Sequence, residues 1–559
     1  MSLTHSSSSI YKLMDKIESS DSSIGIPLHQ HDSTSQNDLE SGISGASSSN
    51  TKTNINNNNN NNNSELKDSI GSAGGLNEPQ MTHFLLEEDF SKDSKIPNKY
   101  KKVFYILASL IIITTIVLLI VFLIPRGWTP PHKKLNIIFM IGDGMGPASL
   151  TLSRRAFNQT SLNLDPYLVG TLQTYSSSSW VTDSAAAATA YASGIKTYNE
   201  AIGVNPDKRP VGTIIEAANA KEMKSGLVVT TRISDATPAA FYSHSVNRNF
   251  ESFITPQILG KGINVILGGG SAYFSNETLA KAVSDGYKLV NNRDEMLAVE
   301  EGKILGLFTP LDLPFEIDRI NQHMTNIPTL AEMTRTALQL LNQDNENGFF
   351  LMVEGSKIDV AGHRNDAASQ IYETQFFDQA FKEALAFAEK DGDTIILITA
   401  DHETGGLTLG YQSDITKYPD YAYDPQMLFQ VNASSVYIMG KVLEDSSNNH
   451  TGDIVKQYTN VQLTPDEIKI INDQKLINPS LIDAMIGRFV SKRANIGFTT
   501  FGHTGVDVNL YAYLNDHVDK FGGNHNNIEL SQYISNSLGL DMTKATELLE
   551  AFVPSPPST

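Results

Sequence analysis

Five short, almost continuously apolar segments recur between residues 135 and 400, and they constrain the fold of this 559-residue chain more than any other feature. They span residues 135–141, 226–230, 263–267, 349–353 and 394–400. Each is rich in β-branched side chains, as is typical of a strand buried on both faces. Helical patterns lie between them at residues 329–341 and 372–390. The alternation predicts an α/β fold with a large, mostly parallel sheet flanked by helices on both faces.

Acidic residues stand just beyond four of these five segments. They are Asp143, Asp235, Glu354 and Asp401. The carboxyl ends of parallel strands meet at one edge of a sheet, which is where such folds bind ligands. A single acid in such a place is more often a helix cap or a turn residue. Four acids at strand ends together predict a functional site.

Three histidines add imidazole groups to this set: His363, His402 and His503. His363 lies four residues after Asp359, so both side chains can face one side of a helical turn. His402 follows Asp401 directly, so the two can share one ion only on an irregular loop after the strand. The chain has no cysteine, which excludes disulfides and thiolate metal sites. Carboxylates and imidazoles in this pattern are typical of a multinuclear metal enzyme.

A serine opens an alanine-rich segment within the same series of motifs. Ser184 is followed by four alanines and preceded by Asp183. Alanine has the highest helix propensity, and the free N–H groups at the start of a helix favour bound phosphate. The sequence therefore places a candidate nucleophile among candidate metal ligands.

Six motifs together resemble those of the alkaline phosphatases in order and spacing. They are residues 141–146 (Ile-Gly-Asp-Gly-Met-Gly), 183–185 (Asp-Ser-Ala), 235–240 (Asp-Ala-Thr-Pro-Ala-Ala), 354–359 (Glu-Gly-Ser-Lys-Ile-Asp) with His363, 399–402 (Thr-Ala-Asp-His) and 503–505 (His-Thr-Gly). The resemblance extends from residue 135 to about residue 540. It implies an alkaline phosphatase-like fold and the hydrolysis of a broad range of small phosphate monoesters through a phosphoserine intermediate.

The resemblance also implies two zinc ions and one magnesium ion per subunit. One zinc would be held by Asp359, His363 and His503. The other would be held by Asp143, Asp401 and His402, with Ser184 as a further ligand. The magnesium would be held by Asp143 as a bridge, by Thr237 and Glu354, and through a bound water by Asp235. An all-oxygen set suits magnesium, and a zinc pair suits the attacking and leaving oxygens of a phosphoryl transfer.

By the same resemblance, Ser184 would be the nucleophile and Arg248 would bind the phosphate. Metal coordination would lower the pKa of the serine hydroxyl, and zinc-bound hydroxide would hydrolyse the phosphoserine. Arg248 lies eleven residues after Thr237, where the family places a phosphate-binding arginine. Its planar guanidinium suits two phosphate oxygens, although an isolated arginine is usually a solvated surface residue.

The residue after Asp359, Val360, departs from the family pattern. Bacterial members pair an aspartate at the position of Asp235 with a lysine at the position of Val360, and animal members have histidines at both. We therefore expect Asp235 to act without this basic partner, with easier phosphate release or altered magnesium binding.

Other classes of function are alternatives to a metal-dependent hydrolase of phosphate monoesters. A phosphodiesterase or a sulfatase would share the two-metal scaffold, but phosphodiesterases commonly carry a threonine nucleophile, and the proline and arginine of a sulfatase motif are absent around Ser184. A non-catalytic membrane protein on this fold would have no physical reason to keep costly clustered carboxylates. The net charge of −20, from 62 acidic and 42 basic residues, argues against a nucleic-acid partner.

Residues 103–124 form a stretch of 22 residues without a charge, long enough to cross about 30 Å of hydrocarbon as a helix. A buried core helix is disfavoured because this stretch is apolar on every face, and a cleaved signal peptide because it lies far from Met1. Its N-terminal flank carries Lys92, Lys95, Lys99, Lys101 and Lys102, against Arg126, Lys133 and Lys134 on the other side. The positive-inside bias predicts a single-pass type II membrane protein with a cytoplasmic N-terminus.

The part after the membrane span would then be lumenal or extracellular. Four N-x-S/T sequons fit that side: Asn158, Asn276, Asn432 and Asn449. The layout resembles vacuolar members of the alkaline phosphatase family, which favours a vacuole or lysosome membrane and leaves the cell surface open. The resemblance further implies a homodimer.

The expected domain organisation follows from these features. Residues 1–102 are rich in Ser and Asn and too poor in apolar side chains to fold, which predicts a disordered cytoplasmic tail. A linker over residues 125–134 separates the span from a catalytic domain over residues 135–545, and residues 546–559 form a C-terminal tail. Residues 405–501 are expected to form an inserted lobe like the crown of the family.

Overall fold

The computed structural model describes residues 97–123, 134–514 and 522–554. The expected tail over residues 1–102 and the expected linker over residues 125–134 lie almost entirely outside these described residues. The described residues fall into two parts, one around the helix α2 and one from residue 134 onward, and each is considered by itself.

The first part is the helix α2, Asn98–Leu123. Its segment Asn98–Leu119 is long and apolar enough to cross a membrane, and none of it is buried. Two of its hydroxyl groups bond to the helix backbone: Ser109 donates to the carbonyl oxygen of Tyr105 and Thr115 to that of Ile111, each at 2.7 Å. Such bonds satisfy groups that hydrocarbon would leave unpaired. By length and composition, α2 is the candidate membrane span that the sequence predicts.

The second part is built on one large sheet. Ten described strands form it: β1 (Asn136–Ile141), β2 (Leu168–Gln173), β3 (Lys224–Arg232), β4 (Val265–Gly269), β5 (Tyr287–Val290), β6 (Lys303–Leu307), β7 (Phe349–Glu354), β8 (Thr394–Thr399), β13 (Val508–Tyr513) and β14 (Gly523–Asn526). Their order is β14-β2-β13-β8-β1-β7-β3-β4-β6-β5, and within the described sheet only β13 runs antiparallel to its neighbours. The five predicted strands are confirmed as β1, β3, β4, β7 and β8.

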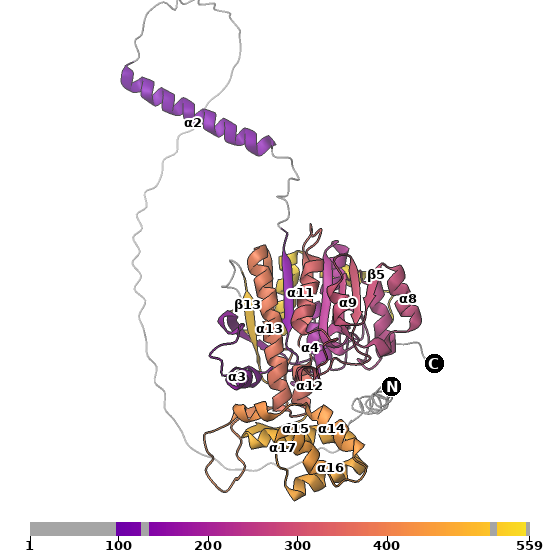
Figure 1. Ribbon diagram of the computed structural model, residues 1–559. Helices are drawn as coiled ribbons and strands as arrows, with labels where there is room; N and C mark the ends of the chain where they lie inside the picture. Colours follow the sequence, from indigo (N-terminus) through magenta and orange to yellow (C-terminus); the bar gives the residue numbers. More distant parts are fainter. Residues whose placement is uncertain (1–96, 124–133, 515–521, 555–559) are drawn as a thin grey trace, which may run out of the picture. The chain divides into compact units, whose positions relative to one another are not determined.

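Helices cover both faces of this sheet (Figure 1), as the sequence predicts. On one face, α11 (Leu330–Leu341) packs against α13 (Ala367–Asp391). On the other, α4 (Ser184–Ser193), α5 (Ile214–Ala220), α6 (Ala236–Tyr242) and α18 (Asn527–Leu538) pack together. Because both faces are covered, every residue of β1, β7 and β8 is buried. Burying one such large apolar side chain contributes about 1.5–3 kcal/mol.

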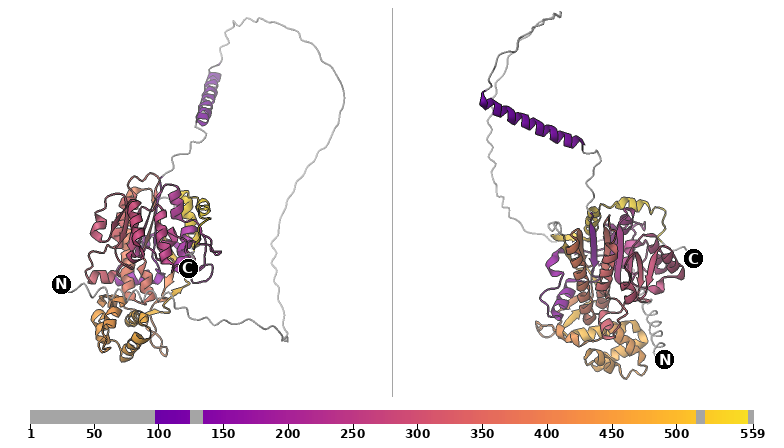
Figure 2. Two further views of the ribbon diagram at one scale, coloured as in Figure 1. Left: turned by 90° about the vertical axis from the view of Figure 1, so that its right-hand side faces the viewer. Right: turned by 45° about the horizontal axis from the view of Figure 1, so that its top comes forward.

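A helical lobe lies at one end of the sheet, drawn in orange to gold in Figures 1 and 2. It contains β10 (Leu407–Leu409), α14 (Ser435–Glu444), α15 (Thr451–Thr459), α16 (Pro465–Ile477), α17 (Ile482–Arg493) and β11 (Ile496–Phe498). These elements bury a second apolar core, which is continuous with the start of α13. Two lobe tyrosines lie outside that core, since Tyr418 is 81% and Tyr421 is 87% exposed.

Shorter elements connect these layers. They are α3 (Pro147–Ala156), α7 (Glu251–Ile254), α8 (Asn276–Ser284), α9 (Arg293–Leu297), α10 (Glu316–Asn321), α12 (Lys357–His363), α19 (Met542–Glu547), β9 (Glu403–Thr404) and β12 (His503–Thr504). The expected C-terminal tail packs on the body as far as it is described. Thr546 Oγ1 accepts a hydrogen bond from Gly212 N at 2.9 Å, and the ring of Phe552 lies edge-on to His244.

Candidate functional site

The four acids predicted at strand ends lie along one edge of the sheet. Their strands β8, β1, β7 and β3 are consecutive neighbours. Ile141, the last residue of β1, pairs with Thr399 on one side and with Glu354 on the other. All four strands are parallel, so the residues that follow them emerge at the same edge.

Asp143, Asp401 and His402 form one cluster at this edge. One ligand atom from each lies within 4.8 Å of the others, and all three residues are buried. His402 Nε2 lies 3.1 Å from Asp401 Oδ2 and 3.7 Å from Asp143 Oδ1. Asp401 and His402 lie between β8 and β9, on the irregular loop that the sequence predicts.

Asp359, His363 and His503 form a second cluster beside the first. Asp359 and His363 lie on α12, and His363 Nε2 is 3.2 Å from Asp359 Oδ2. His503 comes from β12 and places its Nε2 3.2 Å from His363 Nε2 and 3.6 Å from Asp359 Oδ1. Burial alone would raise the pKa of Asp359, but His363 and His503 hold it well below its ordinary value.

The outer ring nitrogens of this second cluster are held by backbone carbonyl oxygens. His363 Nδ1 lies 2.5 Å from the carbonyl oxygen of Phe501, and His503 Nδ1 lies 2.8 Å from that of Thr182. A proton on each Nδ1 leaves each Nε2 with a lone pair directed at the cluster. This is the orientation that a metal-ligating histidine needs.

The clusters fit divalent cations. Three carboxylate oxygens at this edge, two from the first cluster and one from Glu354 beside it, are buried and have no hydrogen-bond partner within the described part of the chain: Asp143 Oδ1, Asp401 Oδ2 and Glu354 Oε2. Burial and the charges of Asp401 and Asp359 raise the pKa of Asp143 well above its ordinary value. Burial also raises the pKa of Glu354 well above its ordinary value. Buried carboxylates without partners are costly unless a cation neutralises them.

A set of residues with oxygen donors lies on the β3 side of the first cluster. Thr237, in the first turn of α6, donates a 3.4 Å hydrogen bond from its Oγ1 to Asp143 Oδ2. Glu354 stands at the end of the neighbouring strand β7 and is almost fully buried. These are the oxygen donors that the sequence assigns to a hard cation.

Ser184 faces the first cluster. It is the first residue of α4, which Asp183 caps by accepting a 2.9 Å hydrogen bond from Ala186 N. The Oγ of Ser184 lies 3.1 Å from His402 Nε2, and the residue is only 3% exposed. The cap therefore fixes the helix start and the hydroxyl at the cluster of Asp143, Asp401 and His402.

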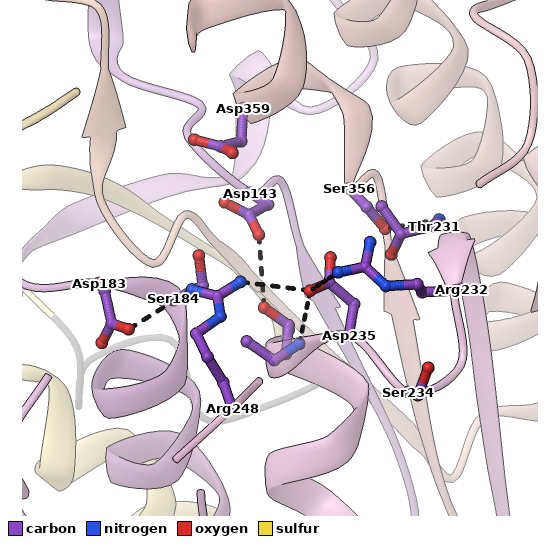
Figure 3. Close-up of polar contacts among 12 residues, drawn as sticks. Asp143, Asp183, Ser184, Thr231, Arg232, Ser234, Asp235, Arg248, Ser356 and Asp359 are labelled. Atoms are coloured by element: carbon purple, nitrogen blue, oxygen red, sulfur yellow. Dashed lines mark hydrogen bonds and ion pairs between the residues drawn. The ribbon is translucent and has the colours of Figure 1, made fainter. Parts of the chain in front are cut away.

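Arg248 spans the front of this arrangement, as Figure 3 shows. Its Nη1 lies 3.4 Å from Asp183 Oδ2, and its Nη2 lies 3.2 Å from Asp235 Oδ1. The side chain is 26% exposed, so its guanidinium can reach an anion that enters beside Ser184.

Asp235 has no basic partner at the position of Val360, but it has basic partners elsewhere. Two guanidinium groups contact it, from Arg248 and from Arg232, whose Nη2 lies 3.3 Å from Asp235 Oδ1. Burial would raise the pKa of Asp235, but Arg232 and Arg248 hold it below its ordinary value. Val360 packs instead against the apolar core of the lobe.

Two further residues of the site were not singled out from the sequence. Thr404 donates from its Oγ1 to Asp359 Oδ1 at 2.5 Å and also lies 3.2 Å from His402 Nδ1. Arg232, at the end of β3, contacts Asp235. The only signal in the sequence is proximity, since Thr404 follows His402 by two residues and Arg232 precedes Asp235 by three.

Comparisons with known proteins agree with this geometry. The alkaline phosphatase family profile matches residues 134–540. The repressible alkaline phosphatase of Saccharomyces cerevisiae is 38% identical, and the match covers 84% of this chain and 94% of the relative. The cold-active alkaline phosphatase of a psychrophilic Shewanella sp. is 34% identical with a TM-score of 0.65, over 72% of this chain and 100% of that structure. A variant of the TAB5 alkaline phosphatase, solved with magnesium bound, is 29% identical with a TM-score of 0.54, over 73% of this chain and 99% of that structure. The chain belongs to the alkaline phosphatase family.

Proposed function

We propose that this protein hydrolyses phosphate monoesters to an alcohol and inorganic phosphate through a phosphoserine on Ser184. The observation that carries the proposal is the 3.1 Å contact between Ser184 Oγ and His402 Nε2. This contact supports a nucleophilic role for Ser184, because its hydroxyl lies beside a cluster of buried carboxylate and imidazole groups and near Arg248.

In the first half of the reaction, the guanidinium of Arg248 binds two non-bridging oxygens of the substrate phosphate. Asp183 and Asp235 hold that guanidinium in place from either side. Ser184 Oγ attacks the phosphorus, the ester P–O bond breaks, and the alcohol leaves with a proton. The N–H groups at the start of α4 favour the negative charge of the phosphate.

In the second half, a water oxygen attacks the phosphoserine on the opposite side from Ser184. The bond between phosphorus and Ser184 Oγ breaks, the serine recovers a proton, and inorganic phosphate is released. Both halves displace an oxygen in line, so the attacking and leaving groups need stabilisation on opposite sides of the phosphorus. The two clusters supply those two sides.

We propose that two zinc ions and one magnesium ion belong to each subunit. When bound, they would supply the Lewis acidity that lowers the pKa of a coordinated hydroxyl and neutralises the phosphate oxygens. One zinc site is assigned to Asp359, His363 and His503. The other is assigned to Asp143, Asp401, His402 and Ser184. The magnesium site is assigned to Asp143, Thr237 and Glu354, with Asp235 acting through water. The unpartnered carboxylate oxygens support this assignment.

We also propose that α2 anchors the protein as a type II membrane protein, with the catalytic domain lumenal or extracellular. A vacuole or lysosome membrane is favoured over the cell surface. All four sequon asparagines are exposed, so each can accept a glycan without unfolding. They are Asn158, Asn276, Asn432 and Asn449. Glycans at these sites would mark the lumenal side of the membrane.

A homodimer is proposed as the assembly, from the resemblance to the family. Exposed aromatic side chains are typical interface anchors, and the catalytic part carries several, including Trp180 at 81% exposed. Sedimentation of the detergent-solubilised protein distinguishes a dimer from a monomer.

The proposed activity is tested on the full-length protein, purified in detergent, with a chromogenic phosphate monoester. The wild type is compared with Ser184→Ala and with protein stripped by a chelator and then reloaded with zinc and magnesium. Ser435→Ala is the matched control, because Ser435 also opens a helix and is also 3% exposed. Activity should disappear in Ser184→Ala and in stripped protein, return with metal and persist in the control. A folded, metal-loaded wild type without activity on the monoester would reject the proposal.

A further inference from the structure

Arg232 is surrounded by three carboxylates that come from separate segments. Its Nε lies 2.9 Å from Glu251 Oε2, its Nη1 3.2 Å from Asp312 Oδ1 and its Nη2 3.3 Å from Asp235 Oδ1. Glu251 lies on α7, and Asp312 lies in the loop before α10. A planar guanidinium with fixed donors can hold three partners in one geometry, which a lysine cannot do.

We propose that Arg232 is a positioning residue for phosphate binding, which acts through Asp235 on the phosphate-binding Arg248. This inference rests on the proposed function. It assigns a role to Arg232, which is not one of the groups that react with the substrate in that function. Figure 3 draws the contacts of Asp235 with Arg232 and with Arg248 as dashed lines.

A single oxygen connects the two arginines. Asp235 Oδ1 accepts hydrogen bonds from Arg232 Nη2 at 3.3 Å, from Arg248 Nη2 at 3.2 Å and from Ala236 N at 2.9 Å. Three donors on one oxygen fix the plane of the carboxylate. Asp235 therefore restrains one side of the Arg248 guanidinium, and Asp183 restrains the other.

Arg232 is itself restrained by several contacts, so it can hold Asp235 in place. Its Nε contacts both oxygens of Glu251, at 2.9 and 3.0 Å, and its backbone N donates to Asp312 Oδ1 at 3.0 Å. Ser234 Oγ donates to Glu251 Oε2 at 2.5 Å and holds that carboxylate in turn. The backbone and the side chain of Arg232 are thus both restrained.

Removing the Arg232 charge has two consequences for an incoming phosphate. Asp235 loses one of the two guanidinium groups that share its Oδ1, so it pairs more strongly with Arg248 and competes with the phosphate for that guanidinium. Glu251 and Asp312 also lose their cation, and their negative charges repel the phosphate dianion. Both effects weaken phosphate binding and leave Ser184 and its neighbours in place.

The test uses full-length, metal-loaded Arg232→Met, because methionine keeps much of the apolar stem and removes the charge. Binding of inorganic phosphate is measured by calorimetry, and kcat and KM are measured with a phosphate monoester. We expect phosphate affinity to fall about tenfold and KM to rise by a similar factor, with kcat within about threefold of wild type. Unchanged phosphate affinity in a folded Arg232→Met protein would overturn the proposal.

Arg335→Met is the matched control. Arg335 also makes a two-contact ion pair, with Glu383 at 2.8 and 2.9 Å, but on helices away from the site. Its loss should leave phosphate affinity unchanged. If the Arg335 variant weakens phosphate binding as much as the Arg232 variant, the effect is one of general stability or charge, and the positioning role is rejected.

A double-mutant cycle tests the route through Asp235. In an Asp235→Asn background, Arg232→Met should weaken phosphate binding clearly less than it does in the wild type, because only the repulsion by Glu251 and Asp312 then remains. An equal loss in both backgrounds would overturn the route. If Arg232→Met does not fold, Arg232→Gln removes the same charge but keeps a hydrogen-bond donor for the neighbouring carboxylates, and it should weaken phosphate binding in the same direction. Failure of the proposed function is distinguishable, since it would leave the wild type itself without turnover.

Discussion

The hydroxyl of Thr404 donates a 2.5 Å hydrogen bond to Asp359, and the same oxygen lies 3.2 Å from His402 Nδ1. One hydroxyl thus joins a residue of each of the two clusters. Because its proton is used on Asp359, its oxygen accepts from His402 Nδ1. The Nε2 of His402 is then left unprotonated, where it faces Asp143, Asp401 and Ser184.

Replacing Thr404 with valine should therefore weaken metal binding. The side chain keeps its shape but loses both hydrogen bonds, and outer contacts of this kind are worth about 10- to 100-fold in metal affinity. Zinc affinity, measured by competition with a chelator, should fall by that factor, and Thr404→Ser should restore most of it. Thr459→Val removes a buried hydroxyl of the lobe, which donates to Val455 O at 2.7 Å and accepts from Val461 N at 3.1 Å, and it should leave zinc affinity unchanged. Equal zinc affinities in all four proteins would contradict the role of Thr404.

Gly144 should tolerate no side chain. Its φ is +69°, and a Cβ at this position would lie 2.6 Å from the Cα of Asp359 and 2.9 Å from Thr404 Oγ1. Gly144→Ala should displace the two clusters relative to each other, and a displacement of about 1 Å can reduce turnover about a hundredfold. Gly286→Ala is the control, because Gly286 has φ +89° but nothing within 4 Å of a Cβ. If both variants keep wild-type kcat/KM, close packing at Gly144 is not required.

Stability should depend on pH through Glu216. Burial raises the pKa of this carboxyl, but His244 and Lys261 together lower it by more, and the resulting pKa is about 2. A depressed folded-state pKa contributes stability that is present above the unfolded pKa of about 4.3 and is lost as the pH falls toward 2. Glu216→Gln should reduce the free energy of unfolding at pH 7 by on the order of 2–3 kcal/mol and flatten its decline below pH ~4.5. Denaturant unfolding at several pH values measures this, and parallel curves for the two proteins would contradict it.

Glycosylation should report the membrane topology. With the catalytic part lumenal, an endoglycosidase should increase the electrophoretic mobility of the protein isolated from cells. Asn→Gln changes at the four sequons together should abolish that shift, and α2 should stay embedded in the membrane fraction. An unglycosylated catalytic part that protease digests in sealed vesicles would place it on the cytoplasmic side instead.

The central sheet and most of the site could be predicted because their signals are local. The run before Asp143 is apolar and β-branched, and β1 is buried at each of its residues. The cap of α11 is equally local, since Thr329 and Glu332 form a capping box three residues apart. Parallel strands then bring together acids that are far apart in the sequence, as the general geometry of such sheets requires.

The contacts of Arg232 could not be predicted in the same way. Its partners Glu251 and Asp312 lie 19 and 80 residues away, and neither belongs to a recognisable motif. The basic partners of Asp235 could not be predicted for the same reason, because they are Arg232 and Arg248 and not a residue at the position of Val360. The antiparallel strand β13 was also missed, since Val508–Tyr513 contains the polar residue Asn509 and carries a weaker signal than a fully apolar run.

The most direct test of the account is to trap the covalent intermediate. The full-length enzyme is mixed with a phosphate monoester, quenched in acid during turnover, digested and mapped by mass spectrometry. The account predicts phosphate on Ser184, absent from Ser184→Ala and from protein stripped of metal. Turnover of the monoester with no phosphate on Ser184, or with phosphate on another residue, would contradict it.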